Sequence, residues 1–367
     1  MHCSSLGEFE QGRPVIERLK AQGTGHKILL TFFSPSGYEV KKNYDGADWV
    51  FYMPIDGPRN AKRFLEIVNP SLVIFVKYEF WHYYLKKIKY RNIPLLLVSA
   101  SFRKNSVFFK WYGILQRKML SRFDHLFVQD EGSKQLMNNI GLGNICTVSG
   151  DTRFDRVIEV AEKFEPIPGI EQFIGNNNCI VAGSTWKEDE ELIQKVLPVI
   201  SEHSLKLIIA PHEINQSHIE DLLKLFPDAS LYSELTGSSQ NQNGHVLIID
   251  NIGLLSRLYK YAFIAYVGGG LTSNGVHNVL EAAVYGKPVL HGPIYHKYYE
   301  AVELLKAGGS VVIEKETELI NCINNFLKNA HACYGLSKEV SKNFVWKNKG
   351  ATEKIIQFIQ ENRLLIN

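Results

Sequence analysis

The sequence lacks the marks of several large protein classes. Its five cysteines, at positions 3, 146, 179, 322 and 333, are scattered and odd in number and form no C-x-x-C pair. This argues against a disulfide framework or a zinc site and for a reducing cytosol. The twelve histidines show no H-x-x-x-H or H-x-H spacing, and no D-x-D follows a strand-like run, so we predict no bound metal. No apolar run approaches the roughly 18–20 residues of a membrane span, and no signal peptide is visible.

What the chain does have is length and apolar content enough for two cores. It holds 367 residues, of which 45% are hydrophobic, which suggests two domains of ordinary size. Its charge is uneven: residues 1–165 carry 24 Lys and Arg against 17 Asp and Glu, and the remainder carries 17 against 21. A basic first half suits an anionic partner such as phosphate, lipid headgroups or nucleic acid, although scattered surface charge gives the same balance.

Short apolar runs alternate with longer helix-like segments along most of the chain, which predicts the α/β class with parallel, doubly wound sheets. One predicted helix covers 107–120. The predicted strands are 27–33, 49–53, 72–76, 94–98, 125–128 and 145–148 in the first half and 179–182, 207–210, 246–249, 263–267, 288–291 and 311–313 in the second.

The domain boundaries are predicted from composition. Residues 165–169 (EPIPG) carry two prolines and a glycine and read as a linker. We therefore predict two Rossmann-like domains, 1–164 and 165–348, and a helix in 349–367 that crosses back to the first domain. Residues 1–7 read as the end of a strand running into a loop, so we expect the first strand to be truncated. Residues 238–244 (SSQNQNG) read as a mobile surface loop.

A glycine-rich turn stands out at 268–270, between a strand-like run and a helix-like run that ends at Gly286. Glycines let backbone N–H groups approach a ligand closely, and the N-terminus of a helix favours phosphate. His277, Asn278 and Glu281 follow in the expected first turn, where they can reach a sugar or nucleotide. An ordinary tight βα turn is the alternative, because glycine motifs have many false positives.

Four side chains are candidates for chemistry. Glu8 follows a glycine and begins a helix, where a first-turn carboxylate that complements the helix dipole is common. Glu79 lies among aromatic residues, where desolvation raises a carboxyl pKa towards that of a useful base. His212 follows a strand-like run and is either a site residue or a helix cap. Arg153 is either a fixed cation for a phosphate or carboxylate or a solvated arginine at a helix start.

Basic and aromatic residues interleave between positions 83 and 112, from Tyr83 and Lys86 to Lys110 and Trp111. This mixture suits a membrane interface or an anionic lipid, and single-stranded nucleic acid uses the same residue types. A solvated helix face over a core is equally compatible with it.

An ordered set of motifs resembles one family, the bacterial 3-deoxy-D-manno-octulosonic acid (Kdo) transferases, over about residues 1–348. The resemblance implies a GT-B fold, two Rossmann-like domains facing a central cleft. The family transfers Kdo from CMP-Kdo to a lipid A precursor with inversion and without a metal, on the cytoplasmic face of the inner membrane. The motifs are SLGEFE at 5–10 with Pro14, YEFW at 78–81, GDTRFD at 150–155, AGST at 182–185, and GGG at 268–270 with HNVLE at 277–281.

The same resemblance implies roles for individual residues. Glu8 matches the family's general base for the acceptor's 6′-hydroxyl, and Glu79 and Arg153 match positions that stabilise the transition state. The donor nucleotide is expected to contact Pro211, His212, Ile252, Gly253, Leu254, Gly268, Gly269, Gly270, His277, Asn278, Val279, Leu280 and Glu281. For the acceptor we predict contacts with Ser5, Gly7, Ser36, Gly37, Arg103 and Lys104. No cofactor, metal or nucleic acid is expected.

The chain departs from the family pattern at three places. Arg153 stands where the family usually has lysine, which keeps the charge but changes its geometry. Ser101 stands where the family usually has arginine, with Arg103 and Lys104 nearby. The sequence begins inside the expected first strand, and family members carry a membrane-anchoring segment ahead of it.

Other functions stay open at this point. A GT-B transferase or epimerase that uses a UDP-sugar shares the fold, although the motifs around Glu8 and Glu79 argue against it. A catalytically inactive nucleotide-binding scaffold is a second alternative, and a nucleic-acid-binding role is the weakest.

Overall fold

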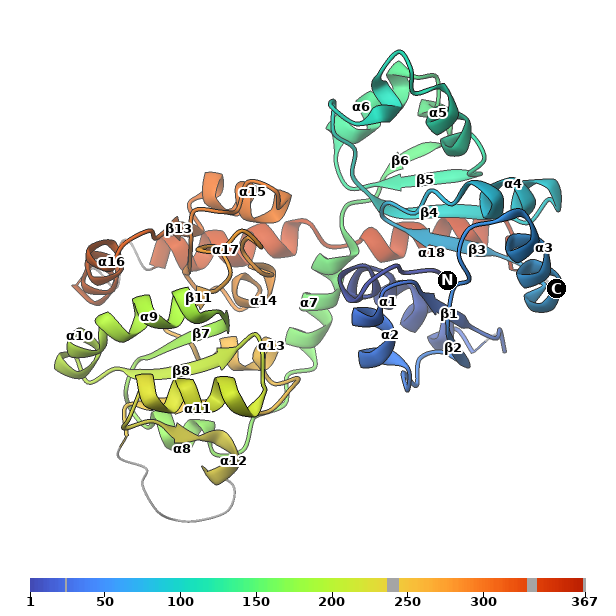
Figure 1. Cartoon of the computed structure of the whole chain (residues 1–367). Helices are drawn as coiled ribbons and strands as arrows, with labels where there is room; N and C mark the ends of the chain where they lie inside the picture. Colours follow the sequence, from blue (N-terminus) through green and yellow to red (C-terminus); the bar gives the residue numbers. More distant parts are fainter. Residues whose placement is uncertain (24, 236–243, 329–334, 366–367) are drawn as a thin grey trace. The chain divides into compact units, whose positions relative to one another are not determined.

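The computed structural model describes residues 1–23, 25–235, 244–328 and 335–365 and divides into two compact units (Figure 1). Unit 1 consists of Met1–Arg156 and Asn348–Asn367, and unit 2 consists of Val157–Lys347. Residues 238–243 of the predicted surface loop lie outside the described residues.

Unit 1 is built on one parallel sheet. Its strands are β1 (Leu29–Phe32), β2 (Trp49–Tyr52), β3 (Val73–Val76), β4 (Leu95–Ala100), β5 (His125–Val128) and β6 (Cys146–Val148). The chain's first three residues join β1 to β3, because His2 N donates to Ile74 O at 2.9 Å and Thr31 N donates to Met1 O at 2.9 Å. The resulting order is β2, β1, residues 1–3, β3, β4, β5 and β6.

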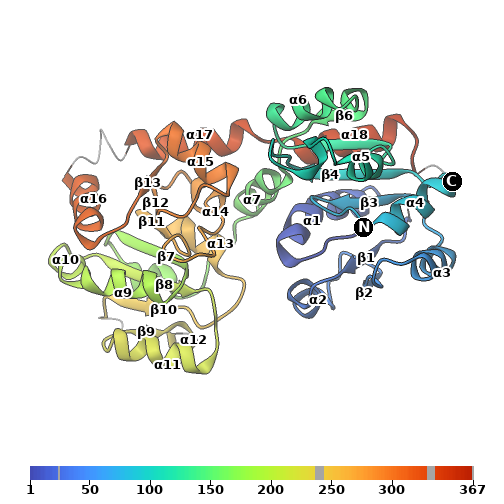
Figure 2. The same ribbon diagram turned by 45° about the horizontal axis from the view of Figure 1, so that its top comes forward.

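Helices cover both faces of this sheet, as the burial of three successive residues in β3, Ile74–Val76, requires. Ile74 and Val76 point to one face, where they pack with α1 (Leu6–Ala21) and α18 (Ala351–Glu361). Phe75 points to the other face, which is covered by α3 (Pro58–Val68), α4 (His82–Tyr90), α5 (Ile114–Leu120) and α6 (Glu131–Asn139) (Figure 2). The remaining elements of unit 1 are α2 (Pro35–Lys41), η1 (Val107–Phe109) and η2 (Gly143–Ile145).

Unit 2 has a second parallel sheet, in the order β13, β12, β11, β7, β8, β10, β9. The strands are β7 (Cys179–Thr185), β8 (Lys206–Pro211), β9 (Ser230–Leu231), β10 (Val246–Ile248), β11 (Ile264–Val267), β12 (Val289–His291) and β13 (Ser310–Val312). The helices are α8 (Ile170–Ile174), α9 (Lys187–Lys195), α10 (Leu197–Glu202), α11 (Gln216–Leu225), α12 (Tyr232–Leu235), α13 (Leu255–Leu258), η3 (Tyr259–Tyr261), α14 (Leu280–Ala283), α15 (Tyr299–Ala307), α16 (Glu316–Lys328) and α17 (Gly335–Lys347).

Each sheet has one point where the strand order reverses direction. In unit 1 it lies between residues 1–3 and β3, and in unit 2 it lies between β7 and β11. Ligands of open α/β sheets bind outside the carboxyl ends of the strands at such a point. The topology therefore marks the turns after residue 3 and after β3, β7 and β11.

The division between the units falls inside α7 (Thr152–Glu162), eight residues before the predicted boundary at 164/165. The segment 165–169 is fixed to unit 2 rather than acting as a linker: Ile167 N donates to the Tyr261 hydroxyl at 2.9 Å, and the Tyr232 hydroxyl donates to Pro168 O at 3.2 Å. The two prolines of the segment suggested a linker. The hydrogen bonds of Ile167 and Pro168 assign the segment to unit 2 instead.

The predicted helix 107–120 is broken. It divides into η1 and α5 around Lys110–Gly113, because Arg117 Nη1 donates to the carbonyl oxygens of Phe108 and Lys110 at 3.0 and 2.8 Å. Because these two carbonyl groups accept from Arg117, they do not take part in the backbone hydrogen bonds of one continuous helix.

Candidate functional site

Glu8 and Glu79 lie on the two sides of the reversal point in unit 1. Glu8 follows residues 1–3 at the start of α1, and Glu79 follows β3. The Glu8 carboxylate accepts a hydrogen bond from Ser5 N at 2.9 Å and so closes a capping box. Burial and, second, the nearby charge of Glu79 raise the pKa of Glu8. Glu8 is therefore a helix-capping residue and also a carboxyl group whose proton affinity is raised.

Glu79 is buried and held in one orientation. Its Oε2 atom lies 3.2 Å from His2 Nε2, and the indole N–H of Trp81 donates to the same oxygen. His2 Nδ1 in turn lies 2.9 Å from the Thr31 hydroxyl. Because side chains from residues 1–3, β1 and the turn after β3 fix this carboxylate, it is preorganised for charge stabilisation.

Arg153 is held by the neighbouring carboxylate of Asp151. Its Nε and Nη2 atoms donate to Asp151 Oδ2 at 2.9 and 2.7 Å. Asp151 is buried and also accepts from Gln11 and Gln129. Desolvation alone would raise the pKa of Asp151, but the Arg153 charge and these hydrogen bonds outweigh it and lower that pKa. The network fixes the direction of the Arg153 guanidinium relative to α1.

The predicted acceptor residues spread along the carboxyl edge of the unit 1 sheet. Ser5 and Gly7 lie at the start of α1, and Ser36 and Gly37 lie in α2. Gly37 is required by packing, because a Cβ atom there would lie 2.3 Å from the Phe32 ring. Arg103 and Lys104 are exposed in the loop after β4.

A cleft of about 470 Å³ opens beside Glu79. Apart from Ser4, Asp56 and Glu79, its lining is largely apolar and comes from the segments that follow residues 1–3, β1, β2 and β3. The lining residues are Ser4, Phe33, Ile55, Asp56, Tyr78, Glu79, Phe80 and Trp81. A carboxylate beside an apolar wall suits a ligand that has both polar and apolar parts.

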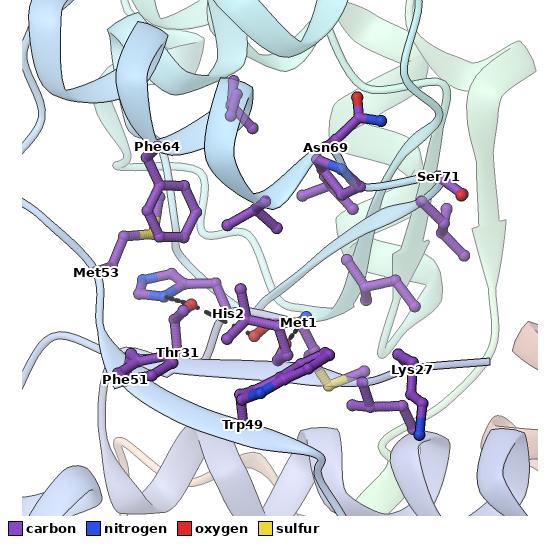
Figure 3. Close-up of a pocket in the computed structure, with 18 of the residues that line it drawn as sticks. Met1, His2, Lys27, Thr31, Trp49, Phe51, Met53, Phe64, Asn69 and Ser71 are labelled. Atoms are coloured by element: carbon purple, nitrogen blue, oxygen red, sulfur yellow. Dashed lines mark hydrogen bonds between the residues drawn. The ribbon is translucent and has the colours of Figure 1, made fainter.

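A larger cavity, of about 890 Å³, lies towards the amino ends of β1 and β3 (Figure 3). Trp49, Phe51, Phe64 and Ser71 are among its lining residues. The Met1 nitrogen donates to Leu29 O there at 2.7 Å. None of the predicted site residues lines this cavity, which is at the opposite edge of the sheet from Glu8.

Three of the seven non-glycine residues with positive φ in the described ranges lie at the same carboxyl edges. Lys77 directly after β3, Ser99 near the end of β4 and Ser184 near the end of β7 have positive φ values of 66°, 53° and 52°. Such a conformation costs a residue other than glycine about 1–3 kcal/mol, and it concentrates at functional sites.

Asp189 organises the reversal point of unit 2. Its buried carboxylate accepts from Trp186 N at 2.9 Å, from Gly269 N at 2.9 Å and from the Tyr266 hydroxyl at 2.7 Å. Burial raises the pKa of Asp189, and the three hydrogen bonds act against that rise. One side chain thus ties the turn after β7 to the turn after β11. The sequence analysis missed Asp189, because its partner Gly269 lies eighty residues away.

Close packing requires glycine at several positions of the turn at 268–270. A Cβ atom on Gly268 would lie 2.4 Å from Ser184 O, and one on Gly270 would lie 2.6 Å from Gly292 N. Gly269 has φ +87°, and Asp189 takes its N–H. The turn lacks side chains because neighbouring backbone segments occupy that space.

The helix after this turn is also shorter than expected. α14 spans four residues, Leu280–Ala283, so its dipole contributes little to anion binding. Asn278 caps it by accepting from Leu280 N at 3.2 Å, and its amide donates to Glu281 at 3.1 Å. Val279 and Leu280 are buried, so their side chains support the turn.

Three rings stack over the reversal point of unit 2. The His212 ring lies 4.7 Å from the Trp186 ring and 4.4 Å from the His277 ring, centroid to centroid. The Trp186 indole N–H donates to His277 Nε2 at 2.9 Å. Burial and, second, the nearby His212 lower the pKa of His277 to about 4, so this ring is neutral near pH 7. Its proton therefore sits on Nδ1, which is a hydrogen-bond donor.

The other predicted donor residues lie along the same edge. Pro211 ends β8, and His212 N donates to Thr185 O at 2.9 Å. Ile252, Gly253 and Leu254 form the turn between β10 and α13. Ile252 is 86% exposed, an unusual state for a large apolar side chain, and that exposure makes it available to a ligand. Trp186 follows a predicted strand end, but the sequence predicted no role for it, although the AGST motif directly before it was recognised.

The described ranges contain neither a metal-binding cluster nor a membrane-spanning helix. In those ranges no group of three or more His, Cys, Asp or Glu side chains is placed to hold a metal ion. In the same part of the chain, no helix has both the length and the hydropathy to cross a membrane.

The two units define a GT-B fold of the α/β class. UDP-GlcNAc 2-epimerase from Neisseria meningitidis, solved with UDP-GlcNAc, superposes with a TM-score of 0.69 at 18% identity and covers 98% of both chains. Glycosyltransferases and epimerases share this architecture.

Sequence comparison identifies the family within that fold class. A family model of 3-deoxy-D-manno-octulosonic acid transferases matches residues 1–156. The Aquifex aeolicus 3-deoxy-D-manno-octulosonic acid transferase is 32% identical over 332 residues, which is 89% of this chain and 85% of that protein. The Haemophilus influenzae enzyme of the same name is 24% identical over 98% of this chain and 86% of its own length. The chain belongs to the Kdo transferase family and is a glycosyltransferase.

The Trp186→Phe variant tests the ring stack. Phenylalanine can still stack on His212 but cannot donate to His277 Nε2, so we expect both neutral tautomers of His277 to be populated. Donor affinity is expected to fall roughly three- to ten-fold, the value of one hydrogen bond. Nitrogen-15 NMR of the histidine rings reads the tautomer directly. Trp49→Phe in β2 is the matched control, and an unchanged tautomer in Trp186→Phe would show that the indole does not select it.

Proposed function

We propose that the chain transfers Kdo from CMP-Kdo to the 6′-hydroxyl of a lipid A precursor, lipid IVA, with inversion and without a metal. Family membership supports Kdo transfer in lipopolysaccharide biosynthesis. The proposed acceptor chemistry rests on one observation. Glu8, whose pKa is raised, lies across the unit 1 reversal point from Glu79.

The proposed reaction is one displacement. Glu8 removes the proton of the acceptor hydroxyl as its oxygen attacks the anomeric carbon of Kdo. The bond from that carbon to the phosphate oxygen breaks, and CMP leaves with the electron pair. Glu79 and Arg153 stabilise the charges that develop, since their partners His2, Trp81 and Asp151 hold them in place.

The proposal gives each unit one substrate. Unit 1 takes the acceptor, with Ser5, Gly7, Ser36 and Gly37 at the strand ends and Arg103 and Lys104 near the acceptor phosphates. The cleft beside Glu79 supports this role, because its apolar wall suits a lipid-linked sugar.

Unit 2 takes CMP-Kdo at the turns after β7, β8, β10 and β11. The neutral His277 ring offers an Nδ1–H to a phosphate or carboxylate oxygen, and Ile252 offers an apolar surface to the base. The Gly269 N–H already donates to Asp189. Side chains therefore supply more of the donor contacts in this proposal than the glycine turn does.

We place the protein at the cytoplasmic face of the inner membrane, attached peripherally or through an N-terminal segment. The acceptor is a membrane lipid in this proposal, so the enzyme must work at that surface. The basic balance of residues 1–165 supports an anionic surface as its neighbour.

The acid limb of the pH–rate profile tests the base. Because Glu8 acts deprotonated, kcat/KM falls as the pH drops below its pKa, which lies above the ordinary glutamate value of about 4.3. The Glu79 charge helps to raise that pKa, so Glu79→Gln is expected to move the limb to lower pH while also slowing the reaction. Glu10→Gln should leave it in place. If the acid limb does not move in Glu79→Gln, a group other than Glu8 is responsible for it.

A donor competition separates this function from a UDP-sugar enzyme of the same fold. CMP and UDP are titrated against the wild-type protein and followed by calorimetry. We expect CMP to bind at least tenfold more tightly. Tighter binding of UDP would favour the second candidate function, an enzyme that uses a UDP-sugar. That candidate is considered because UDP-GlcNAc 2-epimerases have the same fold.

A further inference from the structure

The Glu79 carboxylate uses only one of its two oxygens for contacts within the described residues. Oε2 lies 3.2 Å from His2 Nε2 and accepts from the Trp81 indole N–H. In the described part of the chain Oε1 accepts no hydrogen bond, and it does not belong to the buried polar atoms that lack a partner. Because Glu79 lines the cleft of about 470 Å³, Oε1 is the oxygen that a ligand in this cleft reaches.

The two nitrogens of His2 have different partners. An ionised carboxylate only accepts hydrogen bonds, so Nε2, which faces Glu79, carries a proton. Nδ1 lies 2.9 Å from the Thr31 hydroxyl, which donates to a neutral ring and accepts from a charged one. In the second case the hydroxyl has Met1 O as its own acceptor, at 3.4 Å. The N–H group on Glu79 is therefore kept in both charge states of the ring.

The surroundings of His2 hold its ring in one plane. The residue is 2% exposed, and its ring lies edge-on to the rings of Phe75 and Trp81, with centroids 5.5 and 5.2 Å away. Its backbone N–H donates to Ile74 O at 2.9 Å, which ties it to β3. An imidazole buried among aromatic rings costs free energy unless its nitrogens are hydrogen-bonded. The polar contacts of His2 are thus what this side chain supplies and an apolar one would not.

Two donors on one oxygen fix the carboxylate better than one donor does. The last torsion of a glutamate side chain is soft, so a single N–H leaves the carboxylate free to turn and exchange its oxygens. The N–H groups of His2 and Trp81 come from two different side chains and oppose that rotation. Oε1 consequently stays directed at the cleft.

We infer that His2 is a positioning residue, which holds Glu79 ionised and turns Oε1 towards a hydroxyl group of the sugar ligand. An ionised Oε1 accepts hydrogen bonds and repels a phosphate or a carboxylate, so the group that it meets is a hydroxyl. Thr31 supports His2 in turn. The inference rests on the proposed function, which gives Glu79 a part in the transfer.

Two amide substitutions separate the two nitrogens of His2. In His2→Gln the amide N–H takes the place of Nε2–H, and in His2→Asn the shorter amide reaches Thr31 but not Glu79. We expect His2→Asn to lower kcat roughly ten- to a hundredfold, the value of a hydrogen bond to a charged group, and His2→Gln to stay within about threefold of the wild type. The KM for CMP-Kdo should not change in either variant, because the donor is proposed to bind unit 2.

The matched control is His125→Asn. His125 is also a buried histidine of the unit 1 sheet, in β5, and its Nε2 lies 2.9 Å from the Thr147 hydroxyl. Circular dichroism first establishes that each variant is folded. The control loses one histidine contact, as His2→Asn does, but it should keep the wild-type kcat.

Nitrogen-15 NMR of the wild-type chain reads the proton on the His2 ring directly, with the signals assigned by their loss in His2→Gln. We expect Nε2 to be protonated at pH 7. An Nε2 without a proton, or equal losses of kcat in the two amide variants, would overturn the inference. Absence of transfer by the wild type would instead count against the proposed function, and the NMR result would still decide whether His2 donates to Glu79.

Discussion

Replacing Glu8 by glutamine is expected to slow Kdo transfer by roughly 10²–10⁴-fold, the contribution of a positioned general base. Glutamine at this position can still accept from Ser5 N, so the capping box and α1 are kept. The substitution therefore removes proton transfer without removing the helix start. Single-turnover kinetics with CMP-Kdo and lipid IVA measure the chemical step.

The control for this variant is Glu10→Gln, which changes a carboxylate two residues further along α1. It should keep the wild-type rate within about twofold, as a surface substitution does. CMP affinity should be unchanged in both variants, because the donor is proposed to bind unit 2. Transfer by Glu8→Gln at the wild-type rate would mean that Glu8 only caps the helix.

Removing the Asp189 carboxylate is expected to cost at least about 3 kcal/mol of unfolding free energy. Asp189→Ala leaves two backbone N–H groups and one tyrosine hydroxyl buried without their acceptor, and each such loss costs about 1–3 kcal/mol. Urea denaturation followed by circular dichroism measures the change.

The same variant should also weaken CMP binding more than Trp186→Phe does, because both turns at the unit 2 reversal point lose their common anchor. Glu188→Ala is the control, since Glu188 is exposed on the same helix, α9. A stable Asp189→Ala protein with normal CMP binding would show that the two turns hold their positions without this carboxylate.

The sheets could be predicted from the sequence because their strands are short apolar runs in a regular alternation. β7 and β11, for example, were expected at 179–182 and 263–267 and are found at Cys179–Thr185 and Ile264–Val267. β9 was missed, since two residues carry no periodic signal. The break at Lys110–Gly113 was missed because the helical pattern of 107–120 is overridden by hydrogen bonds from Arg117.

The site could be predicted only in part, for a different physical reason. Residues that stand next to a strand end, such as Glu8, Glu79 and His212, are visible from local pattern and motif. Asp189 and the indole of Trp186 act on partners about eighty to ninety residues away, Gly269 and His277. Such pairs are set by the strand order, which a single sequence does not contain. The three glycines were recognised correctly as a tight turn, while their close neighbours could be seen only in the structure.

The most direct test of the account is a mass-spectrometric transfer assay. CMP-Kdo and lipid IVA are incubated in detergent with the wild-type chain or with the Glu8→Gln variant. We expect a product heavier by one or more Kdo units with the wild type and little or none with the variant. No product from the wild type, together with turnover of a UDP-sugar, would contradict it.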